Sequence, residues 1–175
     1  PDPAPGVPVA AWKVLGAPAP AHFQHRDAVA LLAQPAGRDA AAEALRGHVG
    51  QDAGRGEWLG CWVSDIGTLN QMWMLRGFNS LDDLRRARAE SQRSANPLGV
   101  GEIAQAVEQH SYQGFDWMAP VRPSAESGIR GPIYEIRTYG IKPGGVQATI
   151  DLWQQALPAR EKISPCVAAM VALDG

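Results

Sequence analysis

The chain has few of the residues from which a covalent or metal framework is built. Of its 175 residues only two are cysteine, Cys61 and Cys166, and each lies in an apolar, strand-like run. They show neither the paired spacing of a zinc site nor the density of a disulfide scaffold. We therefore expect both thiols to be reduced and buried, with no metal site.

Long apolar runs and an excess of charge of one sign are also absent. No run approaches the ~18 apolar residues that a membrane-spanning helix requires, and no charged-then-apolar leader precedes the body of the chain. The formal net charge of -2 gives no reason to expect nucleic acid or an anionic membrane as a partner. These features predict a soluble, cytoplasmic protein.

Familiar catalytic fingerprints are missing as well. The chain has no Ser-His-Asp pattern, and Gly99-Val100-Gly101 lacks both the preceding strand and the third glycine of a dinucleotide fingerprint. His22 and His25 lie in a proline-rich arm without zinc-type partners around them. The sequence therefore predicts neither a cofactor nor a metal.

Hydrophobic periodicity predicts an α+β chain organised around residues 57–78. There, two runs rich in aromatic and branched residues flank the polar segment 64–71, which favours an antiparallel hairpin. The pattern predicts strands at 28–33, 58–63, 72–78, 107–115, 133–141 and 166–173, and a short edge strand is possible at 9–15. It predicts helices at 38–49, 100–106 and 146–157, and another that starts after Ser80, a residue that can cap free amides, and stops near Pro97.

The order strand, Pro-x-Gly stop, helix, strand occurs twice in the chain. We interpret residues 1–27 as a proline-rich arm, 28–118 as a first ferredoxin-like βαββαβ repeat, 119–131 as a linker, and 132–175 as a second, incomplete repeat. A half-built repeat leaves a sheet edge unpaired. We expect the sequence to be part of a longer parent; alternatively, a second subunit completes the sheet, or the second unit packs on the first as an extra layer.

Two blocks of sequence resemble the NIPSNAP family. The segments Tyr134-Glu135-Ile136-Arg137-Thr138-Tyr139 and Lys142-Pro143-Gly144 match the strand and turn with which NIPSNAP repeats open. The segments Asp65-Ile66-Gly67 and Leu69-Asn70-Gln71 match a second family hallmark, and the helix that begins Ser80-Leu81-Asp82 matches the one that usually follows. The blocks cover most of residues 57–94 and 132–165.

The resemblance implies a dimeric α+β barrel, in which two ferredoxin-like sheets pack face to face within one chain or across a dimer. Related families with this fold include cofactor-independent monooxygenases and haem-degrading enzymes, whereas NIPSNAP proteins have no agreed catalytic residues. Kinship of fold alone does not establish a reaction. We therefore expect a self-associating protein that binds a small apolar ligand or a protein partner, and we keep a cofactor-free monooxygenase or isomerase as the alternative.

Three residues of the hairpin are candidates for a ligand pocket in the barrel. Asn70 satisfies turn amides in one interpretation, and in the other it donates to a ligand oxygen between Trp62 and Trp73. The tryptophans themselves are core residues in the simpler interpretation and pocket walls in the other.

Three further candidates lie outside the hairpin. His110, on the expected fourth strand, is either a surface or hydrogen-bonded core group or a base. Glu135 and Arg137 lie two residues apart and share one face of a strand, which points either to solvent or into the barrel.

Overall fold

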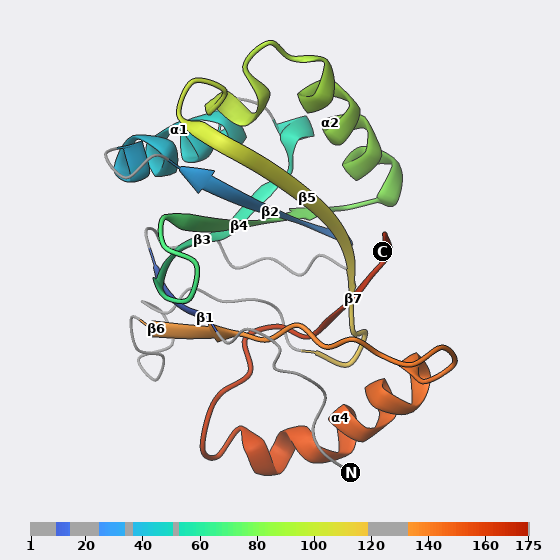
Figure 1. Ribbon diagram of the computed structural model, residues 1–175. Coiled ribbons are helices and arrows are strands. Elements are labelled where there is room, and N and C mark those ends of the chain that lie inside the picture. The colour runs from blue at the N-terminus through green and yellow to red at the C-terminus, as the bar shows by residue number, and fades with distance from the viewer. Residues whose placement is uncertain (1–9, 15–24, 34–36, 51–52, 119–132, 175) are drawn as a thin grey trace.

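The computed structural model describes residues 10–14, 25–33, 37–50, 53–118 and 133–174 (Figure 1). They form helices and an antiparallel sheet of seven strands in the order β6-β1-β3-β4-β2-β5-β7. The strands are β1 (Ala10–Val14), β2 (His25–Ala33), β3 (Glu57–Ile66), β4 (Gln71–Phe78), β5 (Ala104–Gly114), β6 (Ile133–Ile136) and β7 (Met170–Ala172). The helices are α1 (Arg38–Gly50), α2 (Leu81–Arg93) and α4 (Val146–Arg160), with single turns η2 (Ala53–Arg55) and η3 (Pro97–Gly99). The chain is a mixed α/β protein.

The predicted hairpin is present as β3 and β4. The two strands pair antiparallel, with Trp62 opposite Trp73. In the turn between them Asn70 has a φ of 58°, a left-handed conformation that asparagine adopts more readily than most residues. β4 also pairs with β2, which in turn pairs with β5, so β4 lies between two strands that precede it in the chain.

Both α1 and α2 cover the same face of the sheet formed by β3, β4, β2 and β5 (Figure 1). Two of the apolar residues predicted for the inner face of α1, Ala41 and Leu45, are fully buried as expected. They pack with Cys61 and Met74. Burying a leucine of this kind contributes about 1.5–3 kcal/mol. Packing of this face therefore holds α1 on the hairpin.

The start of α2 has the predicted cap. The Ser80 hydroxyl oxygen accepts a hydrogen bond from the backbone N–H of Asp83 at 3.1 Å. Leu84 and Ala87 then turn inward to pack with Phe78. The helix ends at Arg93, shortly before Pro97.

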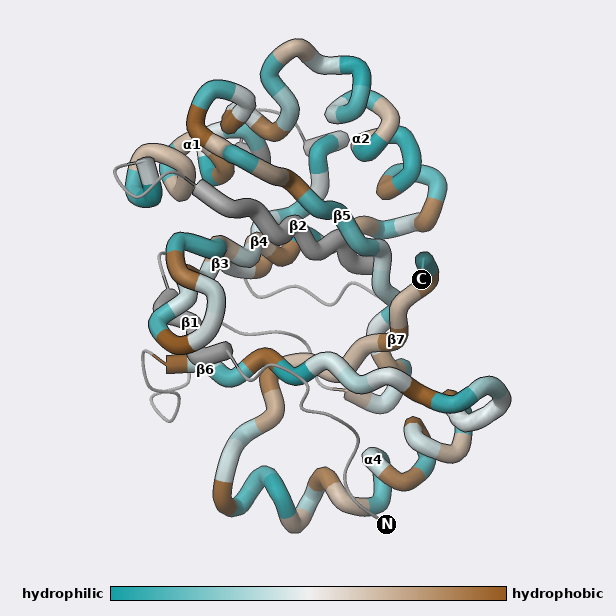
Figure 2. Tube along the Cα trace, in the orientation of Figure 1, coloured by the Kyte–Doolittle hydropathy of each residue, from teal (hydrophilic) through white to brown (hydrophobic). Residues whose placement is uncertain are grey.

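The strands β1, β6 and β7 lie below this sheet layer, and α4 lies beneath them (Figure 1). The possible strand at 9–15 is present as β1, but it lies inside the sheet, between β6 and β3, rather than at an edge. Figure 2 shows apolar segments at intervals along α4. The other layer therefore consists of short strands and one helix.

Some predicted elements differ from the structure. The prediction of a helix at 100–106 was wrong. Just before this segment, Leu98 and Gly99 have left-handed φ angles of 57° and 75°, and within it Ala104 already pairs with Ala33 in the sheet. The strands expected at 133–141 and 166–173 are only four and three residues long, because β6 and β7 each pair with a single described neighbour. The linker expected at 119–131 lies outside the described residues.

Candidate functional site

The face of the sheet opposite α1 and α2 carries an apolar cluster built on the hairpin. Trp62 is 8% exposed and belongs to a core with the buried Leu59 and Leu75, while Trp73, opposite Trp62, is half-buried against it. Gly60 makes room for the indole, since a Cβ there would lie 2.6 Å from the Trp62 ring. Alternation along the two strands thus separates these side chains from those that face the helices.

Other strands extend the cluster across both layers. Tyr134 of β6 lies with its ring centroid 5.9 Å from that of Trp62, and Tyr112 of β5 lies 6.4 Å from Trp73. Such tilted ring pairs are favourable arrangements for aromatic side chains. We call the set the interior aromatic cluster; its members are Leu59, Trp62, Trp73, Leu75, Tyr112, Tyr134, Ile136 and Met170.

One polar atom in this cluster has no acceptor in the part of the chain that the structure describes. The indole Nε1 of Trp62 is buried and donates no hydrogen bond to any described residue. A buried donor without a partner costs about 1–3 kcal/mol. The Trp62 N–H is therefore a natural position for the acceptor of a bound molecule.

The structure brings only part of the predicted set together. Trp62 and Trp73 lie side by side in the cluster, and His110 lies beside it, 6.4 Å from the Tyr112 ring and with 45% of its side chain exposed. Asn70 lies in the turn of the hairpin, half-exposed, and its left-handed backbone fits the turn interpretation.

Glu135 and Arg137 lie on the other face of their strand. They form an exposed ion pair at 2.8 Å, while Tyr134 and Ile136 point to the cluster. Two cluster members, Tyr112 and Tyr134, were not among the candidates. Tyr112 lies between the polar Ser111 and Gln113, so alternation could have identified it, whereas the apolar Ile133 before Tyr134 hides the pattern there.

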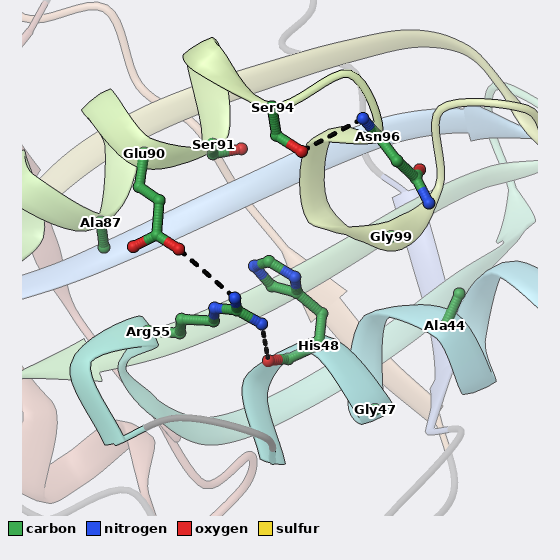
Figure 3. Close-up of a pocket in the computed structure, with 10 residues that line it drawn as sticks. All are labelled: Ala44, Gly47, His48, Arg55, Ala87, Glu90, Ser91, Ser94, Asn96 and Gly99. Atoms are coloured by element: carbon green, nitrogen blue, oxygen red, sulfur yellow. Dashed lines mark hydrogen bonds and ion pairs between the residues drawn. The ribbon is translucent and has the colours of Figure 1, made fainter.

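A separate hollow of about 440 Å³ lies in the helical layer, on the opposite face of the sheet (Figure 3). Arg55 lies at its centre: its guanidinium donates to the backbone oxygen of His48 at 3.4 Å and to the Glu90 carboxylate at 3.3 Å. The hollow lies between the end of α1 and the end of α2, where the helix dipoles favour a cation. Arg55 thus supplies the positive charge that this position favours.

Burial shifts the pKa of two ionisable side chains, His48 of α1 and Cys61 of β3. Burial, with added repulsion from Arg55 and Arg76, lowers the pKa of His48 below its ordinary value, so the imidazole is neutral near pH 7. Burial raises the pKa of the Cys61 thiol to about 12, which keeps it protonated. Cys61 is buried as expected, whereas Cys166 is half-buried, and both are free thiols.

Neither a metal-ligand group nor a membrane-spanning helix is found among the described residues. No three His, Cys, Asp or Glu side chains in this part of the chain are grouped so that they could hold a metal ion. In the same residues no helix is long and apolar enough to cross a membrane.

Comparison with known proteins places the chain among NIPSNAP relatives. The chain is 29% identical over 107 residues to the protein NipSnap homolog of Dictyostelium discoideum, a match that covers 61% of this chain and 46% of that protein. The chain thus matches about half the length of this curated relative.

Solved structures of the family are similar at a lower level. A NIPSNAP family protein of Agrobacterium tumefaciens is 20% identical, with a TM-score of 0.44, and the match covers 56% of this chain and 98% of that one. A NIPSNAP-like domain protein of Burkholderia xenovorans is also 20% identical, with a TM-score of 0.41, and covers 58% of this chain and 95% of that one.

The sequence model of the NIPSNAP family matches residues 32–122, slightly more than half of the chain. The match runs from the end of β2 through α1, the hairpin, α2 and β5. It includes the block with the Asp-Ile-Gly and Leu-Asn-Gln segments, whereas the other block of the resemblance, 134–144, lies outside it. The resemblance is confirmed: the chain belongs to the NIPSNAP family.

Proposed function

We propose that the chain is a binding protein whose interior aromatic cluster takes a small apolar ligand with one hydrogen-bond acceptor. The observation that carries the proposal is the buried Trp62 indole N–H, which has no acceptor among the described residues. Apolar pockets with a few well-placed polar groups are the usual form of a small-molecule site. A carbonyl oxygen of the ligand would accept from Trp62 while its apolar body packs on Trp73 and Tyr134.

The proposal includes the architecture expected of the family. The strand order β3-β4-β2-β5, with α1 and α2 on one face, supports a ferredoxin-like unit in the first repeat, 28–118. The segments β6, α4 and β7 form the beginning of a second unit, 132–175, that faces the first across the cluster. Together they make one side of an α+β barrel.

Packing of the cluster favours binding over the enzymatic alternative. Leu59 and Leu75 are 0% and 3% exposed and fill the floor, so the centre of the cluster is apolar. His110 lies at the margin of the cluster beside Tyr112 and pairs with the exposed Glu108 at 3.8 Å. A general base would need to reach the ligand within hydrogen-bond distance.

Self-association is the other part of the proposal. Leu152 on α4 and Ile163 just after it are 64% and 89% exposed, and such apolar groups favour contact with a second copy. Sedimentation of the chain should show a dimer, and Leu152→Asp should shift it to monomer without loss of helicity. A monomer at micromolar concentration in the wild type would refute this part.

Two ligands of nearly equal shape test the binding proposal. Acetophenone carries a carbonyl, whereas isopropylbenzene has a methyl group in its place. We expect the wild type to bind acetophenone about 3- to 10-fold more tightly, as one neutral hydrogen bond of about 0.5–1.5 kcal/mol implies. The indole N–H signal of Trp62 in an NMR titration, assigned from Trp62→Phe, should shift with acetophenone alone.

Trp62→Phe is the control variant: it keeps an aromatic ring but removes the donor together with the second ring of the indole, so the comparison is between the two ligands within each variant. In this variant the two ligands should bind equally. Thermal unfolding would show that the variant is folded. Equal affinities in the wild type, or no binding of either compound, would overturn the proposal.

A further inference from the structure

Small residues on three elements line the hollow of the helical layer (Figure 3). Ala44 and Gly47 line it from α1, Ala87 from α2, and Gly99 from the turn η3. A Cβ on Gly47 would meet no atom of the described residues within 4 Å, so nothing in that part of the chain obstructs the hollow there. The volume of about 440 Å³ is typical of small-molecule sites.

The other residues that line the hollow are polar and include both hydrogen-bond donors and acceptors. They are His48, Arg55, Glu90, Ser91, Ser94 and Asn96. No Trp, Tyr or Phe is among the described residues of the lining, which therefore differs from the interior aromatic cluster and does not suit an apolar ligand. All the lining residues lie between positions 44 and 99, inside the segment that the family model matches.

The charges around the hollow balance one another. The ionised groups that act on the His48 imidazole are Arg55, Arg76 and Glu90, and His48 itself is neutral near pH 7. The last turns of α1 and α2 also line the hollow, and each helix end has about half a negative charge. Two guanidinium groups are thus matched by one carboxylate and two helix ends. A ligand with a net charge of either sign would gain little from this field.

Although balanced, the charges are separated in space. The Arg55 guanidinium lies 3.3 Å from the Glu90 carboxylate, and it donates to the backbone oxygen of His48 at 3.4 Å. The Glu90 side chain is 53% exposed, so its carboxylate can also accept from a ligand. A positive and a negative group side by side form a dipole. Its best partner is a second dipole in the opposite orientation, because each end then meets the opposite charge.

We propose that the hollow binds a small zwitterion of the α-amino-acid type. Its carboxylate would lie against Arg55 and accept from the hydroxyl of Ser91, while its ammonium would donate to Glu90 and lie near the carbonyl end of α2. This site is on the opposite face of the sheet from Trp62, so it adds a second ligand to the proposed function and does not depend on the first.

Four molecules with one skeleton separate the charges of the ligand. Serine has both charges, glycerate has a hydroxyl in place of the ammonium, serinol has a hydroxymethyl group in place of the carboxylate, and glycerol has neither charge. NMR titration of the chain, followed at the His48 ring and the Ser91 amide, would give each dissociation constant. We expect serine to bind about tenfold more tightly than each of the others, as the loss of one charge-assisted hydrogen bond implies.

Glu90→Gln is the matched variant of the chain, because the amide keeps the shape of the side chain and removes its negative charge. Since Glu90 is half-exposed, the fold should hold. The preference for serine over glycerate should fall to about threefold or less, while the preference for serine over serinol remains. Glu161→Gln makes the same change of charge at an exposed position just after α4, in the other layer, and should alter neither preference.

Several results would overturn the proposal. Tighter binding of serinol than of serine would assign the hollow to a cation, and tighter binding of glycerate would assign it to an anion. Equal binding of all four molecules, no binding of serine, or an unchanged ratio of serine to glycerate affinity in Glu90→Gln would each refute a zwitterion site.

Discussion

Single residues decide whether the interior aromatic cluster has a free donor. Trp62 is held in place by its neighbours, with Trp73 opposite, Tyr134 against its ring and Gly60 leaving space for the indole. The tryptophans could be predicted as core residues from their strands. That the indole N–H lacks a described acceptor depends on what lies around it in three dimensions, which no spacing in the sequence specifies.

Gly60→Ala should disturb the cluster from inside the hairpin. The added Cβ would lie 2.6 Å from the Trp62 ring, so the indole must move, and overpacking of this kind costs about 1–3 kcal/mol. Thermal unfolding would measure the loss, and the Trp62 indole signal should shift. Gly47→Ala, inside α1 where a Cβ meets no atom within 4 Å, is the control: it should leave the Trp62 signal unchanged and raise rather than lower the melting temperature, because alanine favours the helix. An unaltered melting temperature for Gly60→Ala would contradict the packing described for Trp62.

At the scale of helices and strands, the sequence correctly predicts the features that depend on a single element. Ser80 caps α2 as expected, and the apolar spacing of α1 corresponds to its buried face. The prediction failed at 100–106, where apolar helical spacing was overridden by two left-handed residues and by pairing of Ala104 with Ala33. A short apolar run is ambiguous until its neighbours are known.

Ser80→Ala should destabilise α2 by about 1 kcal/mol, because the N–H of Asp83 loses its acceptor. Chemical denaturation would show a lower midpoint with an unchanged slope. Ser80→Asn keeps a capping oxygen and should recover most of the loss. Equal denaturation midpoints for Ser80→Ala and Ser80→Asn would show that the Ser80 hydroxyl does not stabilise the helix.

The whole molecule is held together by contacts that join distant segments. Arg88 of α2 donates to Ser111 Oγ and to the Asp174 carboxylate, both at 2.5 Å, and also to the Gln109 carbonyl oxygen at 2.6 Å. The Asp174 carboxylate also accepts from the Ser111 backbone N–H at 2.8 Å. A residue next to β7 is thereby attached to the helix of the first unit.

Acid should loosen this attachment. Burial alone would raise the pKa of Asp174, but the hydrogen bonds from Arg88 and Ser111 outweigh it and hold the pKa below its ordinary value. The carboxylate therefore contributes stability above the unfolded pKa of about 3.9, and this contribution is lost as pH falls through the lower, folded pKa. Because Asp174 is partly exposed, the effect should be under about 1 kcal/mol.

Denaturation at several pH values between pH 2 and pH 6 would measure this loss of stability in acid. Asp174→Asn should lower stability at neutral pH and flatten the acid branch of the profile, and amides of β7 should exchange faster. A variant that matches the wild type at every pH would show that the Arg88 contact does not hold β7.

The sequence by itself determined the features that depend on neighbours along the chain: the hairpin, the cap of α2, the face of α1 and the segments that identify the NIPSNAP family. Alternation along a strand and apolar spacing along a helix involve residues close together in the chain, so both can be recognised from the sequence alone. Only the tertiary structure decided that β1 lies between β6 and β3, that Glu135 and Arg137 lie outside the cluster, and that Arg88 meets Asp174. These depend on which strands pair and how the sheet curves, a choice set by packing between residues far apart in the chain.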